Sequence, residues 1–149
     1  MITFTIYGEP VAQGRPRTGK SFTGKTVVYD PKKSRNYKQY VRLVALEHRP
    51  KNLLESELEL VIDVFRKIPK SMPKYKQELA IEGKLRPTTK PDVDNYAKGI
   101  KDGLSGIIWN DDKQVVSLLV RKWYSSTPRV EVKVIEIEEE GTCQNKLLI

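Results

Sequence analysis

The residues of this chain that most clearly suggest a chemical function are acids gathered in one short region. Asp92 and Asp94 stand one residue apart, and the adjacent pair Asp111 and Asp112 follows a short distance along the chain. Carboxylate oxygens are hard ligands that hold Mg²⁺, and Mg²⁺ in turn binds phosphate. Because the chain as a whole is strongly basic, the sequence predicts a metal-dependent enzyme that acts on nucleic acid.

A lysine follows the first two acids at a spacing that suits catalysis. Asp94 and Lys98 are one helical turn apart, so they share a face if this region is helical. A lysine held beside a metal-binding carboxylate can contact the scissile phosphate or stabilise charge that develops on it. Lys101 and Asp102 extend the same region, and we rank them lower because solvated helix faces commonly carry such residues.

Each of these groups also has a purely structural explanation. Acids at a helix start can cap the helix or complement its dipole. An exposed ion pair between Asp94 and Lys98 would contribute only about 0.3–0.5 kcal/mol. The run from Asn110 to Asp112 is typical of an acidic turn. These roles stay open as alternatives to the catalytic interpretation.

The positive charge is concentrated in the first part of the chain. Residues 1–90 carry 19 Lys and Arg against 9 Asp and Glu, whereas residues 91–149 carry 8 against 10, and the net charge is +8. This distribution predicts salt-dependent binding to a polyanion. Arg15, Arg17 and Lys20 lie in a segment punctuated by glycine and proline, and they are candidates for contacts with the DNA backbone.

Composition narrows the class of protein. With 149 residues we expect a single domain over 1–138, followed by a flexible tail over 139–149. No apolar run reaches the roughly 18 residues that a membrane helix needs. One cysteine, Cys143, permits no internal disulfide, and with the lone His48 it excludes a zinc site of the Cys/His kind. We therefore expect a reduced, cytoplasmic protein.

The periodicity of apolar residues predicts the elements that position the acids. Strands are expected over 2–8, 27–29, 58–65, 114–124 and 129–138, the last two paired as an antiparallel hairpin. Helices are expected from Asp30–Pro31 to about Glu47, over 72–82 with Ser71 as cap, and over 93–104. This order predicts an α+β fold, a two-layer domain with helices packed on a mixed or mainly antiparallel sheet.

The helix over 93–104 sets the geometry of the acidic region. Pro91 disfavours helical structure in the residue before it, so the helix begins at about Asp92. Val93, Ala97, Ile100 and Leu104 form a narrow apolar stripe that we expect to be buried. The connection to the next strand is short enough to bring Asp111 or Asp112 back over the start of the helix.

The same residues resemble a known family motif. The matching positions are Lys90–Asn95, Lys98, Asp102–Leu104, Gly106, Asp111–Asp112 and Gln114–Val115. In this order and spacing they resemble the RusA family of Holliday-junction resolvases, found in bacteria and their phages. The chain length and the basic run Gly14–Arg17 are also similar, although they are less diagnostic.

The resemblance implies a homodimeric endonuclease that nicks opposed strands of a four-way DNA junction symmetrically, in DNA recombination and repair. It implies Mg²⁺, with Mn²⁺ as an alternative, no small-molecule cofactor and no membrane. It makes Asp92 and Asp94 the paired metal-binding acids, Lys98 the catalytic lysine and Asp112 the third essential acid. Asp111 would support Asp112, and the choice between these two as the closer ligand stays open.

Other functions remain alternatives at this point. One is a non-catalytic or differently specific structure-selective nucleic-acid-binding protein, whose binding would be insensitive to EDTA. Another is a metal nuclease that cuts flaps or single strands, and a third is a protein whose acids merely cap helices. Nicking of a synthetic junction in Mg²⁺ discriminates among them.

Overall fold

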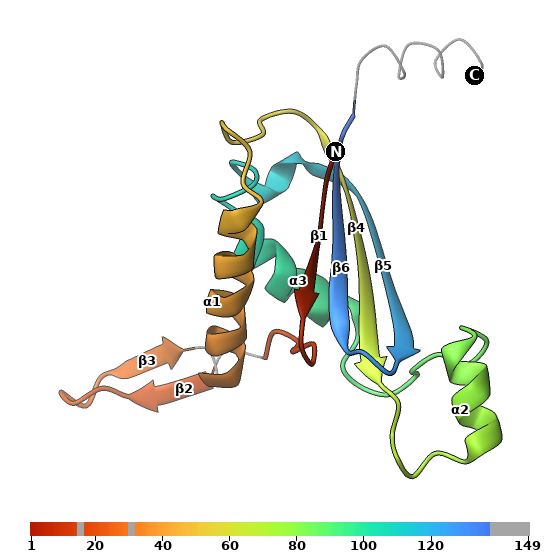
Figure 1. Cartoon of the computed structure of the whole chain (residues 1–149). Helices are drawn as coiled ribbons and strands as arrows, with labels where there is room; N and C mark the ends of the chain where they lie inside the picture. The colour runs from red at the N-terminus through yellow and green to blue at the C-terminus, as the bar shows by residue number, and fades with distance from the viewer. Residues whose placement is uncertain (15–16, 30–31, 138–149) are drawn as a thin grey trace.

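The computed structural model describes residues 1–14, 17–29 and 32–137. Arg15, the expected helix start at Asp30–Pro31 and the expected tail over 139–149 lie outside these residues. The described part forms a mixed four-stranded sheet, and α1 (Lys32–Glu47) and α3 (Val93–Leu104) lie against one of its faces (Figure 1). This two-layer arrangement confirms the α+β prediction.

The sheet contains both parallel and antiparallel pairs. Its strands are β1 (Ile2–Tyr7), β4 (Leu58–Lys67), β5 (Val115–Ser125) and β6 (Arg129–Glu136), in the order β1-β6-β4-β5. β6 is antiparallel to β1 and to β4, whereas β4 and β5 are parallel. The parallel pair requires the chain to return from one end of the sheet to the other, and α2 and α3 lie within that return.

The expected hairpin of the last two strands is wrong, because β4 lies between them. Leu60 of β4 pairs with Leu118 of β5 on one side and with Val134 of β6 on the other. β4 takes the central place because its inward side chains are fully buried, whereas β5 exposes much of its apolar surface at the edge. The connection over 126–128 can span roughly 13 Å when extended, and stepping over one strand needs only about 9.6 Å.

Helix α3 has the predicted bounds and packs closely on α1. A Cβ atom added at Gly103 would lie 2.6 Å from Cγ1 of Val41, so only glycine permits this approach. Ala97, Ile100 and Leu104 are buried as expected. Val93 is 40% exposed, which corrects its place in the stripe; Tyr96, only 3% exposed, takes the buried position in that first turn instead.

The core lies between the helices and the sheet. It is formed mainly by the inward residues of the strands and by the segment that follows α3, and its largest fully buried members are Ile6, Leu58, Leu60, Ile62, Ile100, Leu104, Ile108 and Trp109. Burial of this apolar surface is the main stabilising contribution. In the part of the chain that the structure describes, no helix has the length and apolar character to cross a membrane.

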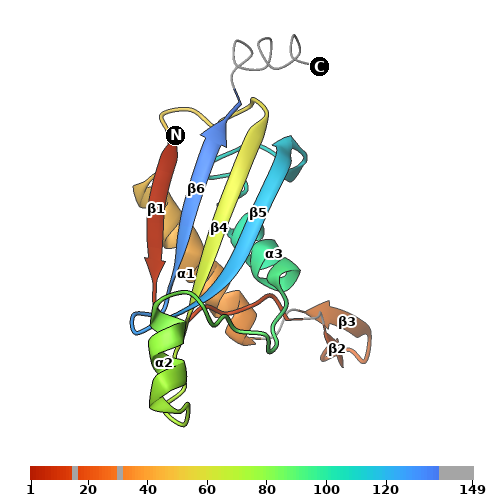
Figure 2. The ribbon, with the colours of Figure 1, turned by 90° about the vertical axis from the view of Figure 1, so that its right-hand side faces the viewer.

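Helix α2 (Lys74–Ile81) lies at the lower end of the sheet, near the end of β5 (Figure 2). It is shorter than expected, and the expected cap at Ser71 is wrong because Pro73 occupies the N-cap. The carbonyl of Pro73 accepts hydrogen bonds from the amides of Lys76 and Gln77. The proline thus fixes the start of the helix without a side-chain cap.

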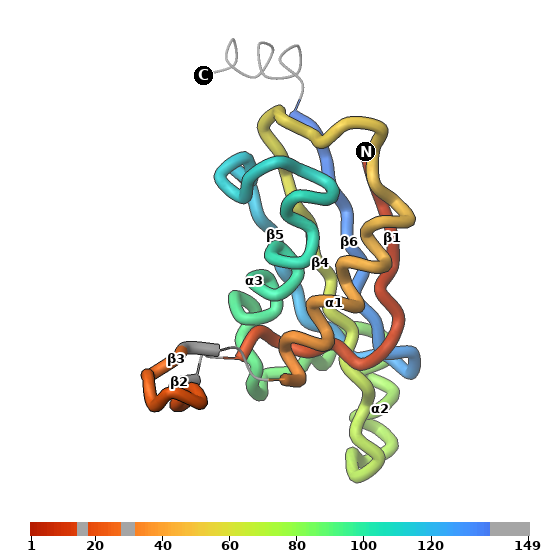
Figure 3. Tube along the Cα trace, turned by 90° about the vertical axis from the view of Figure 1, so that its left-hand side faces the viewer, coloured from red at the N-terminus to blue at the C-terminus, as the bar shows by residue number. Residues whose placement is uncertain are grey.

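The basic segment punctuated by glycine and proline forms a regular β-hairpin. β2 (Arg17–Lys20) pairs antiparallel with β3 (Thr26–Tyr29), and the pair makes a separate two-stranded sheet. It projects from the end of the molecule at which α1 begins (Figures 1 and 3). The short strand expected over 27–29 is therefore confirmed, as part of this hairpin.

Candidate active site along helix α3

Asp92 occupies the N-cap position of α3 without capping it. Its backbone is extended, with φ −75° and ψ 159°, and its side chain makes no capping hydrogen bond. Asp92 therefore does not cap the helix through its side chain, and its carboxylate is exposed. Asp94 follows in the first turn, where the helix dipole favours negative charge.

Two cations from the sheet hold the loop that precedes Asp92. Nη1 of Arg66 donates hydrogen bonds to Oγ1 of Thr89, at 3.1 Å, and to the carbonyl of Lys90, at 3.0 Å. Nζ of Lys122 donates to the carbonyls of Thr89, at 2.9 Å, and Pro91, at 3.0 Å. Hydrogen bonds from charged donors are among the stronger ones, so the ends of β4 and β5 fix the path of the chain into α3.

Sequence reasoning missed Arg66 and Lys122 as positioning residues. Both lie far from the acidic motif in sequence, and each sits near the end of a strand among other basic residues. Their carbonyl partners carry no side-chain signal in the sequence. Only the parallel pairing of β4 with β5 brings both cations to the same loop.

On its other side, the start of α3 is tied to the segment over 9–14. The amide of Gln13 donates a 3.0 Å hydrogen bond to the carbonyl of Asn95. A Cβ atom at Gly99 would lie 3.6 Å from the amide nitrogen of Gln13, so the two segments are in close contact. Oγ of Ser34, in the first turn of α1, accepts a 2.9 Å hydrogen bond from the amide of Gly14. The segment over 9–14 therefore makes hydrogen bonds to the first turns of both α1 and α3.

Asp111 and Asp112 have different surroundings. Asp111 caps the short 3₁₀ turn Asp112–Gln114: its Oδ1 accepts from the amide of Lys113, and its own amide donates to Oε1 of Gln114. Oδ1 of Asp112 instead accepts a 2.8 Å hydrogen bond from the indole Nε1 of the fully buried Trp109. The core thus orients Asp112 through Trp109, whereas the carboxylate of Asp111 is used to cap the 3₁₀ turn.

A groove runs along one side of α3 and brings several predicted residues together. It has a volume of roughly 340 Å³ and is lined by Asp94, Ala97, Lys98, Lys101, Asp102, Asp112 and Leu118. We call it the α3 groove. Asp94, Lys98 and Asp102 follow one another at helical spacing, and Asp112 enters from the segment after the helix. Asp111 does not line this groove.

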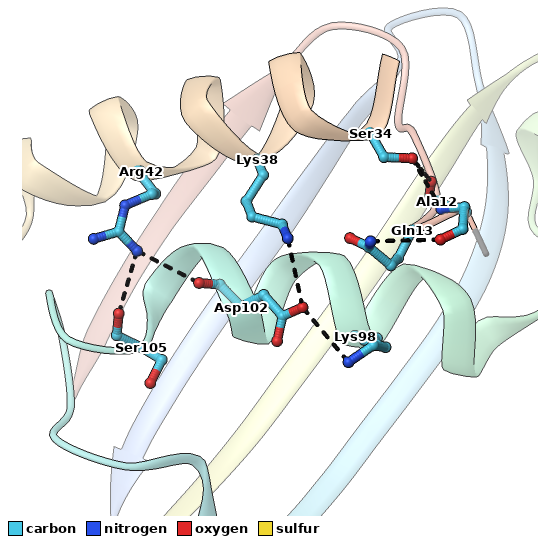
Figure 4. A network of polar contacts seen from close by, with 9 residues as sticks. Ala12, Gln13, Ser34, Lys38, Arg42, Lys98, Asp102 and Ser105 are labelled. Carbon is cyan, nitrogen blue, oxygen red and sulfur yellow. Dashed lines mark hydrogen bonds and ion pairs between the residues drawn. The ribbon is translucent and has the colours of Figure 1, made fainter. Parts of the chain in front are cut away.

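Lys98 makes its ion pair with Asp102 rather than with Asp94, which differs from the arrangement expected from the sequence. Its Nζ lies 3.6 Å from Oδ2 of Asp102, and Nζ of Lys38 on α1 lies 3.8 Å from the same oxygen (Figure 4). Arg42 of α1 also donates to the carbonyl of Asp102, at 3.5 Å. Asp102, ranked low from the sequence, thus connects the candidate lysine to α1.

Asp92 opens onto a second, larger hollow on the other side of the helix start. This Asp92 cleft has a volume of roughly 780 Å³, and its lining includes Glu9, Lys33, Arg66, Lys90 and Tyr96. Burial raises the pKa of the Tyr96 phenol against the opposing effect of Arg66, so the phenol stays neutral. Three cationic side chains line a cleft that also holds two acids, which suits an anionic ligand accompanied by a cation.

The three predicted acids therefore do not form one compact cluster. Among residues 1–14, 17–29 and 32–137, no group of three or more His, Cys, Asp or Glu is close enough to hold a metal ion. Asp94 and Asp112 share the α3 groove, whereas Asp92 faces the neighbouring cleft. Mg²⁺ is commonly held by only one or two carboxylates, together with waters and substrate phosphates.

The predicted DNA contacts are placed only in part. Arg15 lies outside the described residues, and Arg17 is described only by its backbone, as the first residue of β2. Lys20 is exposed at the end of β2, next to the turn of the hairpin.

Comparison with known proteins identifies the family of the chain. The family model of the endodeoxyribonuclease RusA matches residues 7–135. An uncharacterized protein of Bacillus subtilis (strain 168), YqaN, is 54% identical over 138 residues, which cover 91% of this chain and 96% of that protein. The crossover junction endodeoxyribonuclease rusA of Lactococcus phage r1t is 27% identical over 120 residues, covering 79% and 84% of the two chains.

These matches define the class of protein as an endodeoxyribonuclease, a hydrolase of phosphodiester bonds in DNA. The chain belongs to the RusA endodeoxyribonuclease family, as its motif predicted.

Proposed function

We propose that the protein resolves four-way DNA junctions by Mg²⁺-dependent hydrolysis, with paired symmetric nicks made by a homodimer. Membership of the family implies resolution of Holliday junctions. The observation that carries the proposal is the α3 groove, which Asp94, Lys98 and Asp112 line together, while Asp92, whose carboxylate makes no capping bond, faces the neighbouring cleft. The cellular setting would be recombination and repair of DNA in the cytoplasm.

The donor chemistry of the acids fits a divalent cation. Asp94 and Asp112 line one groove, Asp92 makes no capping bond, and all three supply the carboxylate oxygens that Mg²⁺ prefers. In this proposal Asp94 and Asp112 hold Mg²⁺ or Mn²⁺ in the α3 groove, and Asp92 contributes from the neighbouring cleft together with waters and substrate phosphate. Asp111 supports Asp112 from its cap position. Such an ion, when bound, lowers the pKa of water and offsets charge on a phosphate.

The remaining steps fall to the protein's own side chains. Lys98 would place a positive charge beside the scissile phosphate and stabilise the charge that develops on its oxygens. Asp102 would hold the ammonium group of Lys98 in the groove through its ion pair. Trp109 would fix the rotamer of Asp112, and Arg66 and Lys122 would fix the approach of the chain to Asp92. Preorganised charges of this kind need no rearrangement during the reaction.

Binding of the junction would depend on phosphate contacts. Lys33 and Lys90 line the Asp92 cleft, Arg17 and Lys20 lie in β2, and Arg15 comes two residues before that strand in the sequence. Contacts to phosphates position DNA without reading its sequence, which suits recognition of shape. A two-fold symmetric dimer would offer two equivalent sites to the two strands that must be cut.

The decisive experiment uses a synthetic four-way junction with a mobile core, and a duplex of matched sequence as control. We expect paired nicks in the junction alone, with Mg²⁺ present, and none after EDTA is added. Asp94→Asn should bind the junction without cutting it. A wild-type protein that binds the junction in Mg²⁺ and leaves every strand intact would instead be a non-catalytic, structure-selective binding protein.

A further inference from the structure

The β2–β3 hairpin has almost no core of its own. Within the described residues from Thr18 to Val27, no side chain is buried, and neither strand makes an extensive contact with any other helix or strand. An isolated two-stranded hairpin is marginally stable in water. A ligand that covers such an arm would stabilise it further.

The tip of the arm is nevertheless well defined. The amide of Ser21 donates a 2.7 Å hydrogen bond to the carbonyl of Lys25, and the amide of Gly24 donates to the carbonyl of Ser21 at 2.9 Å. Oγ of Ser21 accepts from the amide of Lys25 at 3.2 Å and shares a 2.9 Å hydrogen bond with Oγ1 of Thr23. Gly24 has a φ of +83°, which a side chain would strain.

This turn presents one large apolar side chain to solvent. Phe22 is fully exposed at the tip, and the exposed Lys20 and Lys25 lie at the two ends of the turn. A basic arm that ends in an aromatic ring combines the two features that grip nucleic acid: cations for phosphates and a flat apolar face for bases. Turns favour Gly, Pro, Asn, Asp and Ser, so the turn itself gives no reason for a phenylalanine here.

The arm also starts beside the candidate active site. The segment that leads into it is held by the hydrogen bond of Gln13 to Asn95 on α3 and by that of Gly14 to Ser34 on α1. In the view of Figure 3, the hairpin projects from the end of the molecule where α3 begins. DNA in the Asp92 cleft would therefore lie within the region from which the arm extends.

We propose that Phe22 is a wedge that enters branched DNA at the branch point and stacks on an unpaired or unstacked base. This proposal rests on the proposed function, because it deepens the same recognition of junctions. Apolar side chains inserted between bases are a common means of holding distorted DNA. Unstacking costs least where the stack is already interrupted, so the ring favours a branch over intact duplex.

The proposal is tested with a four-way junction that carries 2-aminopurine at the branch point, with Ca²⁺ in place of Mg²⁺ to keep the strands intact. Wild-type protein should change the fluorescence of the probe on binding, and Phe22→Ala should not. Phe22→Ala should bind the junction about tenfold more weakly, because one stacked base is lost. Its affinity for duplex should stay unchanged, and Phe22→Tyr should restore the junction affinity.

Two control variants separate stacking from other effects. Lys20→Gln should weaken junction and duplex equally and reduce the salt dependence of binding by about one phosphate contact. Tyr75→Ala removes another exposed aromatic ring, on α2, and should change neither affinity. Light scattering on each variant reports the oligomeric state.

The outcomes distinguish this inference from the proposed function. Equal fluorescence changes in wild type and Phe22→Ala, or equal losses on junction and duplex, overturn the wedge while leaving resolution intact if wild type still nicks junctions. Loss of a dimer in Phe22→Ala also overturns it, since the ring would then contact a second subunit. Absence of nicking overturns the proposed function alone, because the fluorescence result still decides the wedge.

Discussion

The indole of Trp109, fully buried in the core, donates a 2.8 Å hydrogen bond to the carboxylate of Asp112 in the α3 groove. Packing in the core holds Trp109 in place, and its hydrogen bond in turn orients the carboxylate of Asp112, which lines the groove. The adjacent Asp111 has no such link to the core and instead completes a capping box with Gln114.

This difference predicts opposite outcomes for two matched substitutions. Asp112→Asn should lower the rate of junction nicking at least about a hundredfold, because it removes a charge from the groove. Asp111→Asn should leave the rate within a few-fold, because asparagine caps a turn as well as aspartate does. Single-turnover assays on both variants, with equal junction affinity checked by gel shift, make the comparison. The reverse ranking would assign the essential role to Asp111.

The position of the loop before Asp92 should depend on the hydrogen bonds that Arg66 and Lys122 donate to it, which we call the loop clamp. Lys122→Met removes the donor to the carbonyls of Thr89 and Pro91 and leaves the stem of the side chain in place. We expect the Mg²⁺ concentration for half-maximal nicking to rise about tenfold, as for other residues that orient metal ligands. Lys133→Met is the matched control, because it removes the same charge at an exposed position of β6. Equal Mg²⁺ midpoints in the two variants would contradict a positioning role.

Asp102 should act on catalysis through Lys98. Asp102→Asn removes the negative charge that lies 3.6 Å from the lysine, so Nζ should sample more positions along the groove. We expect nicking to slow several-fold with unchanged affinity for the junction, and Asp102→Glu to recover part of the rate. Lys98→Met should slow nicking by about two orders of magnitude. If Asp102→Asn stays slow in a Lys98→Met background by the same factor, the two residues act independently.

The contact between α1 and α3 gives a prediction about stability alone. Gly103→Ala places a methyl group 2.6 Å from Cγ1 of Val41, and the stiff, fully buried valine cannot easily move aside. We expect a loss of about 1–3 kcal/mol in the free energy of unfolding, despite the better helix propensity of alanine. The double variant Gly103→Ala with Val41→Ala should be more stable than the sum of the two single effects implies. Urea denaturation of all four proteins completes the cycle.

Asp63 on β4 should make stability depend on pH. Burial alone would raise the pKa of its carboxyl, but hydrogen bonds from Arg121 and Trp123 outweigh burial and lower it. A carboxyl whose pKa is lowered by folding stabilises the protein at neutral pH, and this contribution is lost as the pH falls below its ordinary value of 3.8 through the folded-state pKa. The difference in unfolding free energy between wild type and Asp63→Asn should therefore shrink in that range.

Much of the element order could be predicted because it depends on local signals. Helix α3 has the predicted bounds since Pro91 and an apolar periodicity define both its start and its buried side. The insertion of β4 between β5 and β6 could not be predicted, because neighbours in a sheet are decided by burial on both sides of a strand. The alternation along these two strands is the same whichever partner they have.

The candidate site divides in the same way. Asp92, Asp94, Lys98 and Asp112 were identifiable because their types and spacing form a motif. The residues that hold them were not, since Arg66, Trp109 and Lys122 act through backbone carbonyls or core packing that arise only in the folded chain. The place of Lys98 beside Asp102 depends on rotamers and on Lys38 of α1, which no helical spacing specifies.

The parallel pairing of β4 and β5 has a consequence for how the enzyme matures. Contacts between segments far apart in the sequence form slowly, because a long loop must close before they are gained. The groove and the clamp on its entry loop both require β5 to have docked on β4. We therefore expect a newly made chain to have no nuclease activity until β5 and β6 have joined the sheet. Activity should then appear only when folding is complete.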